Sequence, residues 1–515
     1  MPNDTQQLHD EAVAAYQAGR FDDVRLLAAE LLQHDPAHVG ALHLNGLVAL
    51  AESDAAEARN WLERAIRIRP EPILFNTLYA IHLKLGDTNA AMQSIRRGLS
   101  IKPELAALHY NLALTLHHHD CLDDAAVSYR RTLELEPEHS AAHNNLGRVY
   151  GDLGLLADAE RHYRHAIGLA PGNLVARNNL SMLLLATGRF DEAWPLFEDR
   201  WVSFKRSDGQ PARVPVQVPL PRWAGERWHD GGIEPRATRQ RLLVLHEQGF
   251  GDSLQFVRYL PLLLGLGRFE KVAYVCPLPL RRLYEHSLCA RWPGLVMLDA
   301  VPADLVEWDC YCPLMSLPMA FGTRVDTIPA AAPYLQAETG RATAWRRRLE
   351  ALPQSQPSML RVGVVWAGGH SGIAVDRQRS LSFAQIAPLL AIPHIHWISL
   401  QKTDDLAKRP DTNPHLTDWT DQLHDFADTA ALISQLDLII SVDTSVAHLA
   451  AALGKPVWLL NRFAGCWRWL NARDDSPWYP TLRLFTQPAR GDWHSVLARV
   501  AAALPDPFAV TEKRL

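Results

Sequence analysis

Proline recurs at a nearly constant interval over the first third of this chain of 515 residues. Spaced by 34, 33, 34 and 34 residues, the five positions are Pro36, Pro70, Pro103, Pro137 and Pro171. Two further series keep the period, namely Ala91, Ala125, Ala159 and Ala193, and Gly86, Gly154 and Gly188 with Asp120 in the missing slot. A fixed period of this length predicts a solenoid, because each unit can bury its apolar face only against its neighbours.

Each period has the pattern of two amphipathic helices joined by a short turn. Residues 107–137 (ALHYNLALTLHHHDCLDDAAVSYRRTLELEP) and 141–171 (AAHNNLGRVYGDLGLLADAERHYRHAIGLAP) carry apolar residues at helical spacing. These segments resemble tetratricopeptide repeats, in which small residues let paired helices pack closely and a closing proline turns the chain into the next repeat. We expect about five complete repeats between residues 38 and 201, a partial repeat before them, and a solenoid over residues 1–205.

An asparagine series follows the same period in the first helices of three repeats, at Asn111, Asn145 and Asn179. The arrangement resembles the O-GlcNAc transferases, in which asparagines at the matching position line the groove and bind the backbone of a protein acceptor. An amide offers both a donor and an acceptor, so it can hold an extended peptide without reading its sequence. The resemblance implies that these residues bind an acceptor. A hydrogen bond to a neighbouring backbone group between helices explains them equally well.

The helical pattern is lost between Trp201 and Gln240, where Pro, Gly and Arg are frequent, and this predicts a linker over residues 206–239. Beyond it, short apolar runs such as RLLVLHE and LDLIISV alternate with helix-like stretches, which predicts a mostly parallel sheet covered on both faces. The series breaks between residues 322 and 360. We therefore expect two Rossmann-like halves, residues 240–350 and 351–515, that share a cleft at the carboxyl ends of their strands.

The most specific motif lies in the second half, over residues 436–460 (LDLIISVDTSVAHLAAALGKPVWLL). A buried strand brings Asp443 and Thr444 to the edge of the sheet. A helix that begins near Ser445 aims free backbone N–H groups at the same point and carries His448 in its first turn. The pattern predicts an anion site. In the structural alternative, Asp443 caps the helix and His448 packs beside the strand.

A second motif, LLVLHEQGFGDSLQF, opens the first half. Gly249 and Gly251 suit a sharp turn from strand to helix, and Asp252 is then expected at the helix N-terminus, facing the cleft. A helix cap alone would also explain an aspartate at this place.

A third motif, VGVVWAGGHSGIAVDRQRS, follows the first strand of the second half. Trp366 and Gly368 shape a loop, and Arg377 and Arg379 then offer guanidinium groups that suit a phosphate. The sequence does not decide which arginine would bind it, and either is alternatively a solvated surface charge. A further pair expected to contact the nucleotide or its phosphates is Gln401 and Lys402.

The WAG, DR-x-RS, SLQK, DFADTAALI, SVDTSVAHL and DDSPWYP segments together resemble bacterial proteins that join tetratricopeptide repeats to a domain of glycosyltransferase family 9, the heptosyltransferase family. The resemblance covers nearly the whole chain. It implies an α-solenoid followed by an α/β GT-B glycosyltransferase with two Rossmann-like halves. It also implies that Asp252 is the catalytic base and that residues 443–448 hold the diphosphate and sugar of a nucleotide-sugar donor. Residues 366–380 depart from the pure heptosyltransferases, which leaves the sugar open.

The function implied by the resemblance is that of an inverting glycosyltransferase acting on a hydroxyl of a protein acceptor, such as flagellin, presented by the repeats. The enzyme half has no Asp-x-Asp sequence and Cys310-x-Cys312 is too tight for a zinc knuckle, so we expect neither a metal nor a cofactor beside the nucleotide sugar. The alternatives are a heptosyltransferase-like enzyme acting on a lipid-linked saccharide and a repeat scaffold with a decayed transferase domain.

Charge and hydropathy limit the partners. A net charge of −5 with a pI near 6.5 argues against nucleic acid. The first residues lack the basic and apolar regions of a leader, and no run approaches 18 apolar residues, so we expect a cytoplasmic protein without an integral membrane segment. The sequence names neither the nucleotide nor the acceptor, and it leaves self-association through the repeats open.

Overall fold

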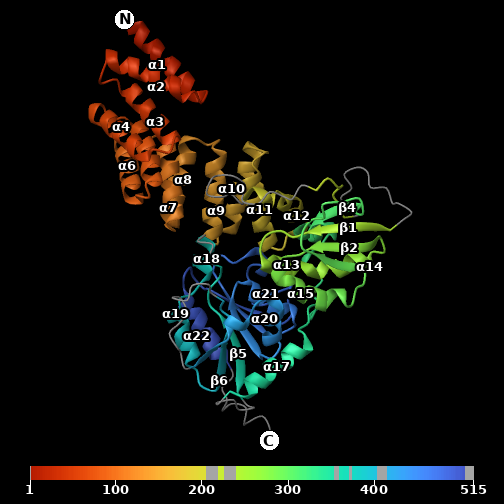
Figure 1. Ribbon diagram of the computed structural model, residues 1–515. Coiled ribbons are helices and arrows are strands. Elements are labelled where there is room, and N and C mark those ends of the chain that lie inside the picture. Colours follow the sequence, from red (N-terminus) through yellow and green to blue (C-terminus); the bar gives the residue numbers. More distant parts are fainter. Residues whose placement is uncertain are drawn as a thin grey trace. The chain divides into compact units, whose positions relative to one another are not determined.

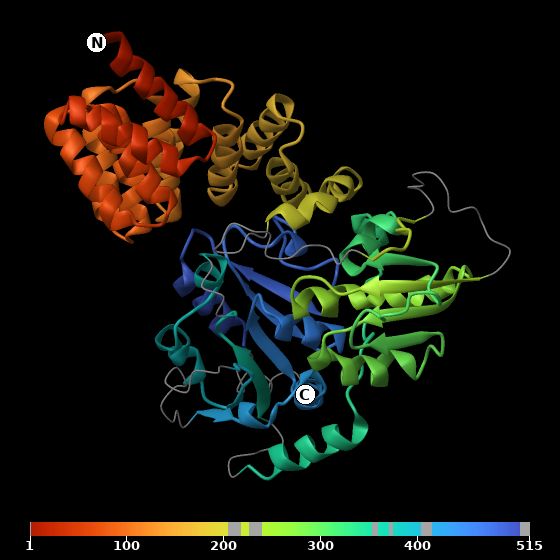
Figure 2. The ribbon, with the colours of Figure 1, turned by 45° about the horizontal axis from the view of Figure 1, so that its top comes forward.

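The computed structural model describes residues 2–203, 218–225, 239–352, 359–369, 374–402 and 415–504 (Figure 1 and Figure 2). Contacts between residues divide the chain into two units, Met1–Ala176 and Arg177–Leu515, and each is described on its own. Among the helices of the described ranges, none combines the length and the apolar character needed to cross a membrane.

The first unit is a series of antiparallel helix pairs, drawn from red to orange in Figure 1. In chain order the helices are α1 (Pro2–Gln17), α2 (Phe21–His34), α3 (Val39–Ala51), α4 (Ala55–Ile68), α5 (Pro72–Lys84), α6 (Thr88–Ile101), α7 (Ala106–His118), α8 (Leu122–Leu135), α9 (Ser140–Asp152) and α10 (Leu156–Leu169). Each odd-numbered helix packs against the next helix, and α2, α4, α6 and α8 pack against the first helix of the following pair. The predicted tetratricopeptide solenoid is therefore confirmed.

The turn inside a repeat uses a left-handed backbone conformation. Gly86 and Gly154 have φ values of 77° and 78°, and Asp120 takes φ 66° in the corresponding slot. Glycine has no Cβ that would clash in this region, and aspartate is among the few other residues that tolerate it. The recurring slot therefore marks the end of the first helix of a repeat, and in the turn between α3 and α4 it is occupied by Ser53 at φ 73°.

The small residues of the period lie where helices approach one another most closely. Ala91, Ala125 and Ala159 are completely buried. At Gly147 an added Cβ would lie 2.8 Å from ring atoms of Tyr163 in the paired helix. A larger side chain at these positions would force the two helices of a repeat apart.

One more helix pair leads from the first unit into the second, α11 (Leu174–Ala186) and α12 (Phe190–Phe197), followed by the 3-10 helix η1 (Glu198–Ser203). The turn between the helices holds Gly188 at φ 78°, as in the repeats before it, and we refer to residues 174–203 as the last repeat. The indole N–H of Trp194 donates to the carbonyl oxygen of Thr323 at 2.7 Å. The boundary between the units, between Ala176 and Arg177, falls inside α11. The domain limits expected from the sequence remain predictions, because residues 204–217 and 226–238 of the expected linker lie outside the described residues.

Two parallel sheets form the rest of the second unit. The first has the order β3-β2-β1-β4, with β1 (Gln240–Leu245), β2 (Phe269–Val275), β3 (Leu295–Leu298) and β4 (Cys310–Pro313). Helices α13 (Phe250–Phe256), α14 (Leu260–Gly265), α15 (Leu278–Tyr284) and α16 (Leu317–Ala320) belong to this half. Residues 242–245 of β1 are all buried, as expected of a strand covered on both faces.

The second sheet has the order β10-β9-β8-β5-β6-β7 and is drawn from teal to blue in Figure 2. Its strands are β5 (Leu360–Val365), β6 (Ile395–Ser399), β7 (Leu416–Asp418), β8 (Leu438–Val442), β9 (Val457–Asn461) and β10 (Leu482–Thr486). The helices are α17 (Thr339–Glu350), α18 (Ala374–Arg379), α19 (Phe383–Leu390), α20 (Phe426–Ile433), α21 (Ser445–Ala452) and α22 (Trp493–Ala503). The fold class predicted from the sequence, a helical solenoid followed by a parallel α/β region, is confirmed.

Each sheet has one point where the strand order reverses. In the first sheet the chain runs outward from β1 through β2 and β3, and β4 lies on the opposite side of β1. In the second sheet β6 and β7 lie on one side of β5, and β8 to β10 on the other. In open parallel sheets, ligands bind beside such reversals, at the carboxyl ends of the strands. The loops after β1, β5 and β8, which carry the sequence motifs, all stand at these points.

Candidate functional site

The loop after β1 carries the first group of expected site residues. The Asp252 oxygen Oδ2 accepts a hydrogen bond from the backbone N–H of Gly249 at 2.8 Å, which is the contact of a helix cap. Its other oxygen, Oδ1, forms an ion pair with Arg468 of the second half. Asp252 therefore caps α13 and also contacts the opposite half of the unit.

The two glycines of this loop differ from the expectation that they make the sharp turn. Gly249 has an extended backbone, with φ −93° and ψ 172°, and the left-handed residue is Gln248 at φ 62°. The turn therefore does not depend on the conformational freedom of glycine. At Gly251, however, an added Cβ would lie 3.0 Å from Cδ2 of His448 and 3.7 Å from Cα of Ser445. Gly251 is needed because the loop approaches α21 closely.

The N-terminus of α21 lies at the end of β8, as the sequence predicts. Thr444 is the N-cap residue, with φ −139° and ψ 167°, and its side chain makes no capping hydrogen bond. Its hydroxyl instead contacts the hydroxyl of Ser441 at 3.0 Å. Asp443 precedes the N-cap, so the structural alternative, in which Asp443 itself is the cap of the helix, does not hold. The side chain of the N-cap residue therefore accepts no hydrogen bond from the N–H groups of the first turn. Asp443, Thr444 and Ser445 are all partly exposed.

His448 is a buried, uncharged imidazole in the first turn of α21. Its Nδ1 lies 2.9 Å from the hydroxyl of Tyr479, and its ring stacks on Trp469 with centroids 5.1 Å apart. Nε2 lies 4.0 Å from Oδ1 of Asp443. Burial, together with the positive charges of Arg468, Arg258 and Arg379, holds the pKa of His448 well below its usual value. At neutral pH it can serve a ligand only through a hydrogen bond.

Of the two arginines expected at the phosphate, Arg379 reaches the site. Its Nη1 donates to the backbone oxygen of Asp443 at 2.7 Å, and its Nη2 pairs with Asp376. An added Cβ at Gly368 would lie 2.4 Å from Nε of Arg379, so the glycine makes room for this guanidinium. Arg377, on the same helix α18, is exposed. The arrangement favours Arg379 for contact with an anion at α21.

Of the three other residues expected to contact the donor, two support the loop after β5. The side-chain oxygen of Gln401 accepts from the backbone N–H groups of Trp366 and Ala367, at 3.1 and 2.8 Å. Trp366 is buried and its ring packs on Phe383. The ammonium group of Lys402 donates to the carbonyl oxygen of Leu423 at 2.7 Å. The contacts of Gln401 and Trp366 hold the loop in place, and Lys402 contacts the segment after β7 instead. A direct role of the three residues in donor binding stays a prediction.

Arg468 is the site residue that the sequence reasoning missed. The aromatic residues Trp467, Trp469 and Tyr479 of the same segment are buried. The arginine among them, on the 3-10 helix η8 (Trp467–Trp469), pairs with Asp252, which lies 216 positions earlier. The WRW sequence, with a cation between two large apolar residues, is a signal that could have found it.

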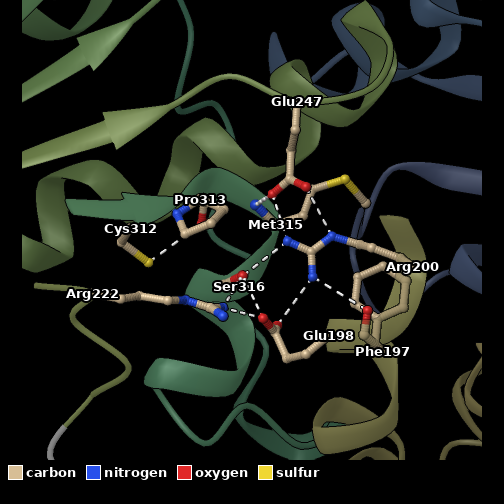
Figure 3. Close-up of polar contacts among 9 residues, drawn as sticks. All are labelled: Phe197, Glu198, Arg200, Arg222, Glu247, Cys312, Pro313, Met315 and Ser316. Carbon is tan, nitrogen blue, oxygen red and sulfur yellow. Dashed lines mark hydrogen bonds and ion pairs between the residues drawn. The ribbon is translucent and has the colours of Figure 1, made fainter. Parts of the chain in front are cut away.

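A buried network of charges lies directly before the Asp252 loop (Figure 3). Arg200 of the last repeat donates to both oxygens of Glu247, each at 2.8 Å, and the backbone N–H of Met315 donates to the same carboxylate at 2.8 Å. On the other side of Arg200, Glu198 accepts at 3.1 Å and pairs with Arg222. These two arginines bring the pKa of Glu198 below its usual value, although burial acts in the opposite direction. The last repeat is thus bonded to Glu247, two residues after the end of β1.

In the repeats, two members of the asparagine series contact side chains of the preceding repeat. The Nδ2 group of Asn111 donates to Oδ1 of Asn76 at 2.6 Å, and that of Asn145 donates to the hydroxyl of Tyr110 at 3.1 Å. Both asparagines are partly exposed, as is Asn179 in α11. The partners are side chains rather than backbone groups of a neighbouring helix. The carbonyl oxygen of Asn145 also accepts from Asn144 at 3.2 Å. An amide oxygen has two lone pairs, so a second one can still accept from a ligand.

Comparison with known families matches both parts of the chain. The model of glycosyltransferase family 9 (heptosyltransferase) matches residues 423–460, a range that includes β8 and α21. Models of the tetratricopeptide repeat match residues 9–71, 80–105, 120–174 and 148–211. The expected resemblance to proteins that combine these repeats with a family 9 domain is therefore confirmed.

Protein FlbA of Caulobacter vibrioides is 26% identical over 347 residues, which are 63% of this chain and 54% of that protein. The match thus spans about half the length of this relative. YrrB, a solved tetratricopeptide protein with an unusual peptide-binding site, is 20% identical over 33% of this chain and 88% of its own, with a TM-score of 0.28. A thermophilic repeat protein of Thermus thermophilus is 21% identical over 35% of this chain and 99% of its own, with a TM-score of 0.30.

Proposed function

We propose that this chain, which combines tetratricopeptide repeats with a glycosyltransferase family 9 domain, is an inverting, metal-independent glycosyltransferase of the GT-B type. It would move a sugar from a nucleotide-sugar donor to a hydroxyl group of a protein acceptor held by the repeats. The proposal includes a cytoplasmic setting and no cofactor beside the donor.

The observation that carries the proposal is the meeting of two loops from opposite sheets. Gly251, next to Asp252, approaches His448 and Ser445 at the N-terminus of α21. An acid–base group on one sheet and an anion-binding helix end on the other are the two parts that sugar transfer needs. Both stand at the reversal points where parallel sheets bind ligands.

In the reaction, a carboxylate oxygen of Asp252 takes the proton of the acceptor hydroxyl. The acceptor oxygen attacks the anomeric carbon, and the bond from that carbon to the diphosphate breaks. The diphosphate leaves with the electron pair of that bond. Each carboxylate oxygen carries two lone pairs, so the existing contacts with Gly249 and Arg468 leave acceptor capacity on Asp252.

The leaving diphosphate gains negative charge as the bond breaks. The N–H groups in the first turn of α21, the hydroxyl of Thr444 and the guanidinium of Arg379 are the groups that would stabilise it. His448, uncharged at neutral pH, would contribute a hydrogen bond through the imidazole atom that faces Asp443.

The repeats support a protein acceptor. Asn111, Asn145 and Asn179 recur at one position of the period and are partly exposed, which suits contact with an extended backbone. A bacterial surface protein such as flagellin remains the acceptor that the resemblance implies.

The family description, heptosyltransferase, favours a second candidate, transfer to a lipid-linked saccharide with the repeats serving assembly only. Acceptor chemistry separates the two. A repeat scaffold without transferase activity would transfer no sugar from a bound donor to either acceptor.

The proposal is tested in two steps. The chain is first mixed with a panel of nucleotide sugars, and the donor is the one that raises its melting temperature. That donor is then supplied with a radiolabelled sugar. The label transferred to the proteins of the bacterium from which the chain comes, and separately to its lipid extract, is measured. Label in protein supports the proposal, and label in lipid alone supports the second candidate. If a donor binds but its sugar is neither transferred nor released by hydrolysis, the chain is a repeat scaffold without transferase activity.

A further inference from the structure

Arg468 stands at the point where the two halves of the second unit meet. Its Nη2 group pairs with Asp252, and only 11% of its side chain and 15% of that of Asp252 are exposed. The guanidinium also lies over the ring of Trp467, at 4.7 Å from the centroid. One residue further on, Trp469 stacks on His448 of α21. Arg468 therefore belongs to the surroundings of the α21 N-terminus as well as to those of Asp252.

The hydrogen-bonding capacity of this guanidinium is only partly used. An arginine has five N–H donors. Nη2 contacts Asp252, and Nη1 contacts the sulfur of Cys466 at 3.0 Å, a weak acceptor. Nε is buried and has no hydrogen-bond partner among the described residues. A buried cation with unused donors is costly unless a ligand completes its contacts.

A positive charge with unused donors beside a helix N-terminus suits one chemical class of ligand, an oxyanion with several acceptor oxygens. The diphosphate of a nucleotide is such a group. One carboxylate oxygen satisfies one edge of the guanidinium, whereas two phosphate oxygens can satisfy a whole fork. The diphosphate can therefore compete with Asp252 for this arginine.

We propose that Arg468 is a diphosphate-binding residue of this chain, and that its ion pair with Asp252 is the ligand-free arrangement. When the nucleotide diphosphate binds at α21, Arg468 turns from the Asp252 carboxylate to the phosphate oxygens. The exchange frees Oδ1 of Asp252 to receive the proton of the acceptor hydroxyl. Donor binding thus prepares the base. The inference rests on the proposed function and adds to it a ligand and an order of events.

The two partners of the ion pair have opposite effects on binding, and this makes the exchange testable. Arg468→Met removes a ligand and is expected to weaken binding of a nucleoside diphosphate about tenfold or more, since hydrogen bonds between charged groups are the strong ones. Asp252→Asn removes the competitor and is expected to tighten the same binding about threefold or more. An ion pair that only held the two halves together would give no tightening.

The experiment is isothermal titration of the full chain with ADP, GDP, UDP and CDP, and with the four nucleosides as ligands that lack phosphate. Nucleoside binding should be the same in the wild-type chain and both variants. Arg473→Gln is the matched control, because Arg473 lies on the same segment and pairs with the exposed Asp475. It should leave all affinities unchanged.

Each outcome decides the proposal. If Arg468→Met does not fold, Asp252→Asn decides alone, and unchanged or weaker diphosphate binding by Asp252→Asn overturns the exchange. Equal diphosphate affinity of the wild-type chain and Arg468→Met also overturns it, while the proposed function survives. A wild-type chain that binds none of the four diphosphates contradicts the proposed function itself, and the inference falls with it.

Discussion

Arg200 and Glu247 form a bidentate ion pair, in which Nε and Nη2 of the arginine each lie 2.8 Å from a different carboxylate oxygen. Only 1% of Arg200 and 4% of Glu247 are exposed. The arginine comes from the last repeat, and the carboxylate comes from the residue before the left-handed turn at Gln248. The loop that carries Asp252 is thus held at its start by a residue of the repeats.

The first prediction concerns the stability of this pair. Arg200→Met should lower the unfolding free energy of the second unit by about 3–5 kcal/mol, because it leaves Glu247 buried without its counter-ion. Unfolding in urea, followed by tryptophan fluorescence, measures the loss. Arg131→Met is the control, since Arg131 pairs with Glu134 in an exposed position of a repeat helix, and it should cost less than about 1 kcal/mol. Equal losses in both variants would contradict the prediction.

A second prediction concerns where the chain can be shortened. A fragment of residues 173–515 keeps the asparagine that caps α11, the contact of Trp194 with Thr323, and Arg200, so it should fold. A fragment of residues 204–515 loses all three and exposes the aromatic surface that the last repeat covers, including Trp467, and it should aggregate or melt at a clearly lower temperature. Circular dichroism and size-exclusion chromatography compare the two. Equal stability would mean that the last repeat is dispensable for the α/β part.

A third prediction tests Asp252 as the base. Asp252→Asn should lower turnover by about 100-fold or more, since general-base catalysis commonly contributes that much, without weakening donor binding. Asparagine accepts the hydrogen bond of Gly249 as well as aspartate does, so a residue that served only as a cap would lose little activity. The control is Asp492→Asn, because Asp492 caps α22. More than half of the wild-type turnover in Asp252→Asn would exclude the assignment.

The repeats provide a fourth prediction. Replacing Asn111, Asn145 and Asn179 together by alanine should raise the KM for a protein acceptor about tenfold or more, at about 1 kcal/mol for each hydrogen bond lost. Donor affinity should not change. Asn89→Ala is the control, because Asn89 is exposed on the second helix of a repeat. Unchanged KM in the triple variant would favour transfer to a lipid-linked saccharide.

A fifth prediction follows from a histidine buried in the solenoid. Burial lowers the pKa of His43 to about 4, and in the unfolded chain the value is about 6.5. The unfolded state therefore binds the proton more readily, so the stabilisation is complete above pH 6.5 and is lost as the pH falls toward 4. Between pH 7 and pH 5 the melting temperature of the solenoid should fall, and it should fall less in His43→Gln. An identical fall in both chains would show that His43 is not responsible.

Much of this architecture can be predicted from local sequence patterns. The proline period, the small alanines and the Gly-or-Asp slot predict the repeats, because each of these residues acts within one helix pair. The end of β8 is likewise predictable, since a buried strand followed by Asp443, Thr444 and a helix is a local arrangement. Which arginine approaches that helix is not local. Arg379 is distinguished from Arg377 by the space that Gly368 leaves.

Contacts between segments that are distant in the sequence could not be predicted from it. The pairing of Asp252 with Arg468 joins residues on two different sheets, and only the packing of those sheets brings them together. The left-handed residue of the loop after β1 is Gln248 rather than a glycine, so a preference based on residue type selects the wrong position. The attachment of the last repeat to the α/β part depends on Arg200 and Trp194, which look like ordinary helix residues in the sequence.

The position of the last repeat bears on how chains of this kind change over generations. The repeats of a solenoid contact only their neighbours, so duplication or loss of one of them alters length without disturbing a core. The pair α11 and α12 does not have this freedom, because Trp194 and Arg200 are bonded to Thr323 and Glu247. We expect descendants of the same ancestral gene to vary in repeat number ahead of residue 173, while the last pair is inherited together with the enzyme as a single piece.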